Sequence, residues 1–535
     1  MGKTTTTKPV SPPVEKAAKK VEPKRRMITK PLKQAKEYLP ALWRVDIDHD
    51  GCILCDLCVL GCPFEVLENK DGKIVSVDDK CTSCEYCVAV CPPDVIDITP
   101  NQTAIRGSGT WTAQHRRDLT KQAMKGGKLL VSMGADEDHP NYFDHMVLDA
   151  CQVTNPSIDP LREPMELRTF LGRKPQRLEF TQDNGGIKLE TEMHPVRVLN
   201  SPIMFAGMSY GAISLNAQTA LAKAAHECGI MFNTGEGGLH EDLAIYGDVA
   251  MGQCASGRFG LDINYLNSVA AIEIKIGQGA KPGIGGHLPG IKVDESISRT
   301  RKIPVGSDAL SPAPHHDIYS IEDLKQLIFA LKEATRYTKP VGVKIAAVHN
   351  VAAIASGIAM AGADFITIDG YRGSTGAAPQ VIRDHVGIPT ELALAAVDDR
   401  LTREGIRNEI TLIITGGFRS SADVAKAIAL GADIVAIGTA VLVALGCTRI
   451  KQCHTNKCPW GIATQDPDLV KRLDPDWGAE RVANMVRGWE LELKEFLGAL
   501  GVNAIESLRG NRERLRGINL SSEELDILGI KHAGT

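Results

Sequence analysis

The chain has 535 residues, of which 43% are hydrophobic, 51 are glycine and 14 are cysteine. This length predicts two or three domains, and the glycine content favours an α/β architecture. A net charge of −4 gives no indication of a nucleic-acid partner, and no apolar run reaches the roughly 20 residues of a membrane span. Because the cysteines are grouped as metal ligands are and no secretory signal precedes them, we expect a cytoplasmic protein.

Residues 1–40 are predicted to be a disordered basic tail. They contain eleven Lys and Arg against three Glu, and almost no large apolar side chains. Such a segment cannot bury enough apolar surface to offset the entropy that ordering would cost. A solvated tail is the simpler interpretation, and an electrostatic tether to an anionic partner is the alternative.

Residues 41–105 carry one cysteine pattern twice, each time as C-x2-C-x2-C-x3-C-P. Two-cluster bacterial ferredoxins use this run, and the fourth cysteine of each run binds the other cluster. The pattern therefore predicts a small α+β ferredoxin-like domain that transfers single electrons. One [4Fe–4S] cluster would be bound by Cys52, Cys55, Cys58 and Cys91, and a second by Cys81, Cys84, Cys87 and Cys62. Zinc is the alternative, which two identical runs disfavour.

Residues 106–200 form a connecting segment with no recognisable chemistry, and from 201 to 465 short β-branched runs alternate with helical patterns. Strands are expected at 202–208, 230–235, 271–277, 341–347, 365–370, 412–417 and 434–439, and an eighth near 309–314. Eight such units in about 250 residues favour a (β/α)8 barrel. A doubly wound sheet is the alternative, but we find no G-x-G-x-x-G fingerprint for it.

Small residues follow the last two expected strands. Gly416 and Gly417 come after one strand, and Gly438 and Thr439 end the next. Barrels bind phosphate groups after strands 7 and 8, where backbone amides can surround a dianion, so this pattern favours FMN. The alternative is that these glycines only permit tight turns.

A lysine lies within one of the expected barrel strands. Lys344 would point into the barrel mouth, and a buried lysine needs a compensating charge. The negative edge of a reduced flavin could provide that charge, and an ion pair with Asp369 or Glu273 is the alternative.

The segment 275–290, KIGQGAKPGIGGHLPG, combines glycines with basic groups. Its glycines allow the backbone to approach a ligand closely, while Lys275, Lys281 and His287 offer positive or titratable groups, and Arg301 follows. We predict an anion site beside the cofactor that suits a dicarboxylate. A solvated basic loop is the alternative.

Three further cysteines, Cys447, Cys453 and Cys458, follow an apolar segment in a C-x5-C-x4-C-P loop. Thiolates at this spacing are soft metal ligands, and three of them suit a [3Fe–4S] cluster or a metal with one open position. Zinc or unliganded thiols are the alternatives. Residues 466–535 have amphipathic helical spacing and are expected to cover the barrel with helices, which would also offer an oligomer surface.

The three-cysteine loop, together with GAISLNAQ at 211–218 and TGEGG at 234–238, closely resembles the synthase domain of glutamate synthases. The resemblance covers about residues 130–500. Its fusion to a ferredoxin-like domain is similar to the arrangement of the short archaeal-type synthases.

This resemblance implies reductive amination of 2-oxoglutarate to L-glutamate with hydride from reduced FMN. Ferredoxin or an NAD(P)H reductase subunit would supply electrons through two [4Fe–4S] clusters and one [3Fe–4S] cluster. Lys281 and Arg301 would bind the substrate carboxylates, Gln278 would lie near the flavin, and Glu236 would contact the iminium nitrogen or relay a proton. The implied FMN-binding residues are Ser209, Gln278, Lys344, Gly370, Gly376, Gly416, Gly417, Gly438 and Thr439.

The chain departs from the family pattern at two positions near the implied substrate. His287 stands where the larger enzymes have glutamine, and Leu239 where they have an acidic residue. These changes leave open a related enzyme of the N-methylglutamate synthase type, which uses methylamine. An electron-transfer subunit of a larger redox complex is a second alternative.

The chain shows no resemblance to the amidotransferase domain or the Gly-rich β-helix of the large glutamate synthases. Separate glutaminase and β-helix subunits, or the use of free ammonia, are therefore expected. An oligomer is also expected.

Overall fold

The computed structural model describes residues 41–101, 110–137, 139–151, 156–175, 177–183 and 185–535. The tail predicted at 1–40 lies outside the described residues. Residues 41–535 form one compact unit. Among the described helices, none is both long enough and apolar enough to cross a membrane.

The ferredoxin-like domain is built from two similar halves. Strand β1 (Trp43–Ile47) pairs antiparallel with β4 (Ile96–Pro100), and β2 (Leu67–Lys70) pairs with β3 (Lys73–Ser76). The short helices α1 (Leu57–Gly61) and α2 (Tyr86–Ala89) each follow a residue in the left-handed conformation, Asp56 and Glu85, at the same position of the two cysteine runs. The predicted α+β domain is confirmed.

The later part of the connecting segment closes the N-terminal end of the barrel. The elements of the whole segment are α3 (Ala113–Lys125), β5 (Leu130–Val131), β6 (Met146–Leu148), β7 (Thr169–Gly172), β8 (Phe180–Asp183), β9 (Gly186–Leu189) and β10 (Val196–Leu199). Strands β7 and β10 pair antiparallel, and their fully buried Leu171 and Leu199 pack among side chains inside the barrel. Thr411, the first residue of its strand, donates a hydrogen bond to the carbonyl of Gly172 at 2.8 Å.

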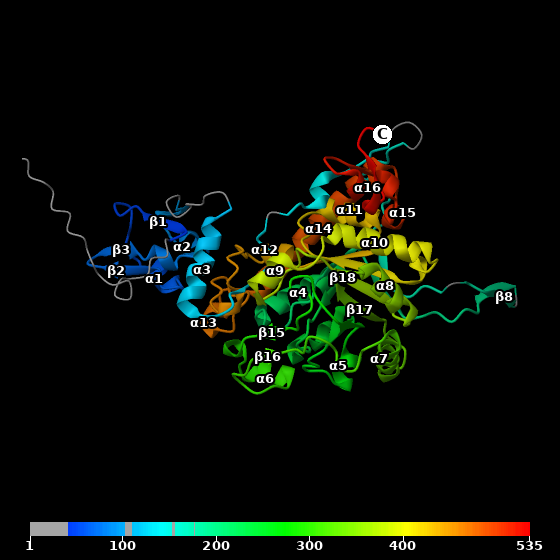
Figure 1. The fold of residues 1–535 in the computed structure, drawn as a ribbon, viewed down its shortest axis with the longest axis horizontal. Coiled ribbons are helices and arrows are strands. Elements are labelled where there is room, and N and C mark those ends of the chain that lie inside the picture. Colours follow the sequence, from blue (N-terminus) through cyan, green and yellow to red (C-terminus); the bar gives the residue numbers. More distant parts are fainter. Residues whose placement is uncertain (1–40, 102–109, 138, 152–155, 176, 184) are drawn as a thin grey trace, which may run out of the picture. The chain divides into compact units, whose positions relative to one another are not determined.

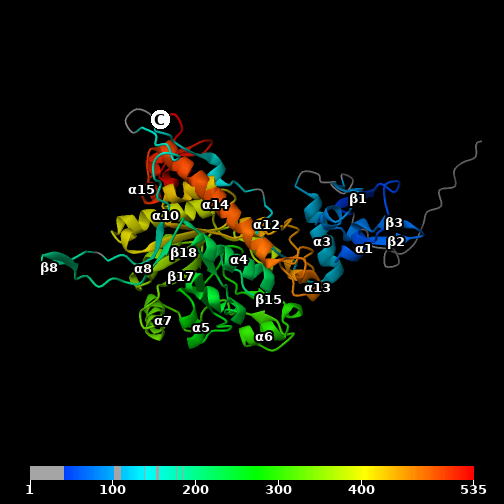
Figure 2. The same ribbon diagram turned by 180° about the vertical axis from the view of Figure 1, so that it is seen from behind.

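A closed barrel of eight parallel strands forms the main domain, which confirms the predicted fold. Its strands in order are β11 (Ile203–Phe205), β12 (Met231–Asn233), β13 (Ala250–Ala255), β14 (Ala271–Lys275), β17 (Val341–Ala346), β18 (Phe365–Asp369), β20 (Thr411–Thr415) and β21 (Ile434–Ile437). Figures 1 and 2 show β17 and β18 inside a ring of helices that includes α4, α5, α7, α8 and α10.

One predicted strand is wrong. The barrel strand that the sequence placed near 309–314 is β13 instead, whose sequence AMGQCA has no β-branched residue to mark it. Residues Ala309–Leu310 form the short strand β16, which pairs with β15 (His287–Leu288) outside the barrel. The small residues of β13 are all buried, so packing rather than local propensity makes this segment a strand.

Several of the barrel helices begin at side-chain caps. The three helices α4 (Leu215–Cys228), α7 (Ile321–Ala334) and α11 (Ser421–Leu430) each follow a serine whose hydroxyl accepts a backbone N–H from the first turn. The other helices of the barrel region are α5 (Ile263–Ser268), α6 (Glu295–Arg301), α8 (Val351–Met360), α9 (Gln380–His385), α10 (Thr390–Arg403) and α12 (Thr439–Ala444).

The C-terminal segment contains the helices α13 (Pro467–Val470), α14 (Pro475–Leu500), α15 (Ile505–Leu508) and α16 (Ser522–Leu528). The long helix α14 packs along α4, α11 and α12, so helices cover part of the barrel as the spacing predicted. The segment also contains two strands that the sequence did not indicate. Strand β22 (Leu515–Gly517) pairs with β6 and with β23 (Lys531–His532).

Candidate active site and cluster loops

A cavity of about 1030 Å³ lies at the C-terminal ends of the barrel strands. Its lining includes Ser209 after β11, Gln278 after β14, Gly416 after β20 and Gly438 after β21. Sites for one small molecule usually have about 300–1,000 Å³, so this cavity has space for a cofactor and a second ligand.

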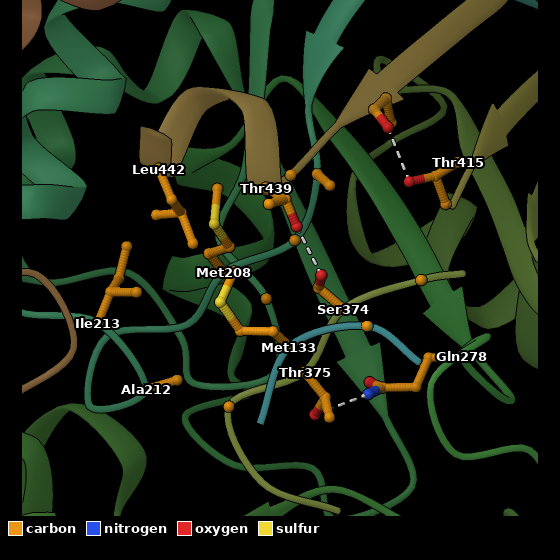
Figure 3. A pocket seen from close by; sticks show the side chains of 18 of the residues that line it. Met133, Met208, Ala212, Ile213, Gln278, Ser374, Thr375, Thr415, Thr439 and Leu442 are labelled. Carbon is orange, nitrogen blue, oxygen red and sulfur yellow. Dashed lines mark hydrogen bonds between the residues drawn. The ribbon is translucent and has the colours of Figure 1, made fainter. Parts of the chain in front are cut away.

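The cavity has an apolar side and a polar side, which Figure 3 shows. Met133, Met208, Ile213 and Leu442 lie on one side, and hydroxyl and amide groups lie on the other. Ser374 and Thr439 share a hydrogen bond of 2.6 Å, and Gln278 Nε2 donates to Thr375 Oγ1 at 3.2 Å. The cavity can therefore receive a ligand that is apolar on one edge and rich in hydrogen-bonding groups on the other.

Two adjacent glycines after β20 shape one wall of this cavity. Gly416 has φ 120° and Gly417 has φ 89°, values in the region that favours glycine. A Cβ atom at position 417 would also lie 2.8 Å from Cβ of Arg372. The backbone can therefore follow this path only with glycine, and both glycines line the cavity.

Lys344 is buried and forms an ion pair, with 3.0 Å between its Nζ and Asp369 Oδ2. Burial alone would lower the pKa of Lys344, but the charges of Asp369 and Glu273 outweigh it and raise the pKa. The ion pair with Asp369, which the sequence left as an alternative, is present. Lys344 also lines the cavity, so its charge acts on whatever binds there.

A group of four buried charged residues also lines the cavity. Lys281 and Arg301 are 3% and 2% exposed, and Nζ of Lys275 lies 3.6 Å from Glu236 Oε2. Arg301 donates to Ser209 Oγ at 2.7 Å and to the carbonyl of Tyr210 at 2.8 Å, and Lys281 donates to the carbonyl of Ala377 at 3.0 Å.

These four charged residues are three cations and one anion, Glu236. Burial lowers the pKa of Lys281 to about 8 and that of Arg301 to about 10, although the charge of Glu236 opposes both shifts. Burial would raise the pKa of Glu236, but Lys275, Lys281 and Arg301 outweigh it and lower that pKa. The excess of positive charge would be relieved by an anionic ligand.

The glycine-rich segment 275–290 approaches other parts of the site closely. A Cβ atom at Gly286 would overlap the carboxylate of Glu236, and one at Gly279 would overlap the carbonyl of Gly370. Glycine is therefore required at these positions so that the segment can lie against Glu236 and the loop after β18.

Most of the predicted site residues line one cavity. They are Ser209, Glu236, Gln278, Lys281, His287, Arg301, Lys344, Gly376, Gly416, Gly417, Gly438 and Thr439. Gly370 does not line it, and its amide instead donates to the carbonyl of Thr415 at 3.0 Å. His287 lies 3.2 Å from Asp308 Oδ2, and Leu239 packs against the barrel core.

Sequence reasoning missed the contribution of the connecting segment. Strand β5 pairs with β19 (Ala378–Pro379), and Met133 N donates to the carbonyl of Thr375 at 2.7 Å. This pairing brings Met133, Gly134 and Ala135 into the cavity lining. No spacing signal in the sequence indicates this, because the contact joins segments more than 200 residues apart.

The three-cysteine loop lies next to the same strand. The thiol of Cys453 is buried, which raises its pKa to about 12, and the charges of Cys458 and Cys447 add to that shift. Ser132, which follows β5, bonds to the thiol of Cys453, and its hydroxyl donates to the carbonyl of Gly376 at 2.7 Å. The loop and the cavity are therefore connected through one serine.

The cysteines of the ferredoxin-like domain are grouped across the two runs. Cys91 lines a small cavity with Cys52, Cys55 and Cys58. Cys62 lies with the other run: burial raises the pKa of Cys84 to about 11 and that of Cys87 to about 12, and the charge of Cys62 contributes to both. An exchange of fourth cysteines between two clusters would need this grouping, and the exchange itself stays a prediction.

Hydrogen bonds link this domain to the three-cysteine loop within the compact unit. The carbonyl of Cys84 accepts hydrogen bonds of 3.2 Å from Thr448 Oγ1 and from Trp460 Nε1. The rings of Tyr86 and Trp460 pack edge to face with centroids 5.5 Å apart. Thr448 directly follows Cys447, so the contact joins one cysteine group to the other.

Within the described residues, no three or more His, Cys, Asp or Glu side chains are arranged as a site for a single metal ion. The expectation of clusters therefore depends on the cysteine spacing and on the grouping of the thiols.

Known family profiles match both the ferredoxin-like domain and the barrel. A profile described as "4Fe-4S dicluster domain" matches residues 44–92, and one described as "Conserved region in glutamate synthase" matches residues 137–503. The fold and these family matches thus define an iron–sulfur oxidoreductase built on a parallel barrel.

Relatives in several organisms extend this match to nearly the whole chain. An archaeal glutamate synthase [NADPH] of Methanocaldococcus jannaschii is 59% identical over 505 residues, covering 93% of this chain and 99% of its own. One of Archaeoglobus fulgidus is 60% identical over 490 residues, covering 91% and 96%. The chain belongs to the glutamate synthase family and is an oxidoreductase that acts on CH–NH2 groups.

More distant matches were also found. The glutamate synthase [NADPH] large chain of Azospirillum brasilense is 38% identical over 377 residues, covering 69% of this chain and 24% of its own. Among solved structures, a lactate oxidase of Pediococcus acidilactici matches with 16% identity and a TM-score of 0.43, covering 73% of this chain and 89% of its own.

Proposed function

We propose that the cavity binds FMN and 2-oxoglutarate side by side and that the chain forms L-glutamate there. The observation that carries this proposal is the group of three buried cations, Lys275, Lys281 and Arg301, around the anion Glu236 at the cavity wall. A dicarboxylate would pair with these cations, and the remaining volume suits a flavin.

The residues that would hold FMN are on the other walls. The amides after β20 and β21 would surround its phosphate, with Gly416, Gly417, Gly438 and Thr439 in the lining. Met133 and Met208 would pack against the ring system, and Lys344 would face its polar edge. When bound, FMN supplies the hydride chemistry of the reaction.

The substrate residues have separate roles. Lys281 and Arg301 would each bind a carboxylate, and both are already oriented by hydrogen bonds to neighbouring groups. Glu236 accepts a hydrogen bond from Ser311 and would hold a proton near the substrate nitrogen. Because this carboxylate is ionised in the free site, it can accept that proton from an ammonium ion.

The cysteines would bind two [4Fe–4S] clusters and one [3Fe–4S] cluster. What supports this is the grouping of the thiols, in which Cys91 lies with the first run and Cys62 with the second. Electrons from a ferredoxin or an NADPH-oxidising partner would pass through the domain 41–105 and reach the loop 447–458 at the contact of Cys84 with Thr448 and Trp460.

The nitrogen would come as free ammonia or from glutamine through a separate subunit. To test this, we would photoreduce the purified protein without oxygen, follow the flavin absorbance, and add 2-oxoglutarate with ammonium. Rapid reoxidation with at least one glutamate formed per flavin is expected if free ammonia is sufficient, because reduced clusters hold further electrons.

Other outcomes of this experiment are equally informative. Reoxidation with methylamine but not with ammonium would replace this proposal by the N-methylglutamate reaction. If reoxidation requires an added glutaminase and glutamine, the separate subunit is the donor. A flavin that stays reduced under all three conditions would overturn the proposed site.

A further inference from the structure

Lys292 is a buried lysine that the proposed chemistry does not use. It lies at the end of the single turn Gly290–Lys292 and is 2% exposed. Its ammonium donates to the carbonyls of Ala212 at 2.9 Å and Ala463 at 2.8 Å. Within the described part of the chain no carboxylate pairs with it, and these two carbonyls are its hydrogen-bond partners.

A buried ammonium without a counter-charge is costly, because transfer of an ion out of water is offset only by paired charges or good hydrogen bonds. Burial lowers the pKa of Lys292 to about 8, and the charges of Cys453 and Cys458 oppose this shift. The remaining charge that acts on it, Arg301, is positive and adds to the shift. Because these thiols are negative only when they are ionised, as cluster ligands are, a cluster in the loop 447–458 would supply the anion that Lys292 otherwise lacks.

The carbonyls that hold Lys292 come from segments next to both sites. Ala212 lines the cavity in the loop after β11, and Ala463 follows Cys458 along the chain. Asn456 of the cluster loop donates to the carbonyl of Ile291, the residue before Lys292. These contacts hold the ammonium at a fixed place next to the loop 447–458. Its charge would therefore act on a group that the three cysteines bind.

We propose that Lys292 is a positioning residue that sets the reduction potential of the cluster held by Cys447, Cys453 and Cys458. This inference rests on the proposed cluster. Reduction adds one electron and breaks no bond, so the bound group becomes more negative by one charge. A fixed cation nearby favours that state, and charge around a cluster is one of the factors that set its potential.

The test is a redox titration of the whole purified protein, followed by the paramagnetic resonance signal of the oxidised three-iron cluster. Lys292→Met and Lys292→Gln both remove the charge, and Gln retains a donor for one of the two carbonyls. In both we expect the reduced-to-oxidised ratio at a fixed potential to fall at least tenfold, a shift of about 59 mV to more negative values. Lys292→Arg should stay near the wild-type potential.

A matched control is Lys339→Met. Lys339 also donates to two backbone carbonyls, those of Asn267 and Val269, but no cysteine contributes to its pKa. Its replacement should leave the potential unchanged. Equal potentials in Lys292→Met, Lys292→Gln and wild type would overturn the proposal, and so would equal shifts in Lys292→Met and Lys339→Met.

Loss of the cluster from the variants would also test the proposal. If the neutral variants lose the three-iron signal while Lys292→Arg keeps it, the charge is needed to hold the anionic cluster, and this role replaces the proposed one. Loss in all three would show that shape rather than charge matters. A wild-type protein with no three-iron signal, or with one that survives Cys453→Ser, would instead refute the proposed cluster.

Discussion

Lys281 and Arg301 show how single buried cations can select a substrate. Both are almost fully buried, both are oriented by hydrogen bonds to fixed backbone or hydroxyl groups, and both share Glu236 as their anion. Because side chains held in this way need little reordering on binding, most of the interaction energy with a carboxylate contributes to affinity.

Replacing Lys281 by Ala should raise the KM for 2-oxoglutarate by about 30-fold or more, since losing a charged partner in a buried site costs at least about 2 kcal/mol. Arg301→Ala should act in the same direction. Steady-state kinetics at saturating ammonium measures the effect, and the flavin content reports whether the site is intact. Lys339→Ala, outside the cavity, is the matched control. A KM within twofold of wild type for Lys281→Ala would contradict the assigned role.

The pKa of Lys281 also predicts a pH dependence. Because burial lowers this pKa to about 8, the side chain is a cation below pH 8 and becomes neutral above it. The kcat/KM for 2-oxoglutarate should therefore fall as the pH rises through about 8, and in Lys281→Arg the fall should move to higher pH. A profile that is identical in the two proteins would assign the fall to another group.

At the scale of elements, the segment 275–290 depends on glycine rather than on its basic residues for its path. It crosses the C-terminal ends of the barrel strands in contact with Glu236 and with the loop after β18. Its short strand β15 pairs with β16, which the sequence had assigned to the barrel itself. The pairing places His287 beside Asp308 at the edge of the cavity.

Gly286→Ala should lower kcat/KM by at least about tenfold, or about 1.4 kcal/mol, because the added methyl group would displace the carboxylate of Glu236. The measurement is steady-state turnover with 2-oxoglutarate and ammonium. Gly488→Ala is a suitable control, since a methyl group there meets open space in helix α14. Wild-type turnover in Gly286→Ala would mean that Glu236 can move without loss.

At the scale of the whole molecule, two cysteine-rich regions more than 350 residues apart in sequence lie in contact with each other. The carbonyl of Cys84 accepts hydrogen bonds from Thr448 and Trp460, and Arg472 stacks over the ring of Tyr86 at 4.1 Å. Two hydrogen bonds of 3.2 Å and an aromatic contact thus connect the second cysteine run with the loop that adjoins the cavity.

Trp460→Ala should slow the reduction of the flavin by an external one-electron donor by about tenfold, because it removes a hydrogen bond and an aromatic contact from this junction. Reoxidation of a photoreduced flavin by 2-oxoglutarate and ammonium should not change, since that step occurs inside the barrel. Stopped-flow absorbance separates the two rates. Trp477→Ala, which alters a surface tryptophan of α14, is the control. Equal effects on both rates would show a general loss of structure.

The sequence by itself determined the groups with a strict local pattern. The two cysteine runs, the glycines after the last two strands and the alternation of strands and helices each depend on neighbours a few residues apart. For this reason the ferredoxin-like domain, the barrel and part of the cavity lining could be predicted. The residues GAISLNAQ, TGEGG and the three-cysteine loop added the family through resemblance.

Only the tertiary structure decided features that depend on contacts across the chain. Strand β13 has no β-branched residue and becomes a strand because barrel closure buries it. Met133 enters the cavity through the pairing of β5 with β19. Lys292 is held near the three-cysteine loop by two carbonyls that are 80 and 171 residues away in sequence. No local pattern encodes such contacts, because they form only when distant segments pack against each other as the chain folds.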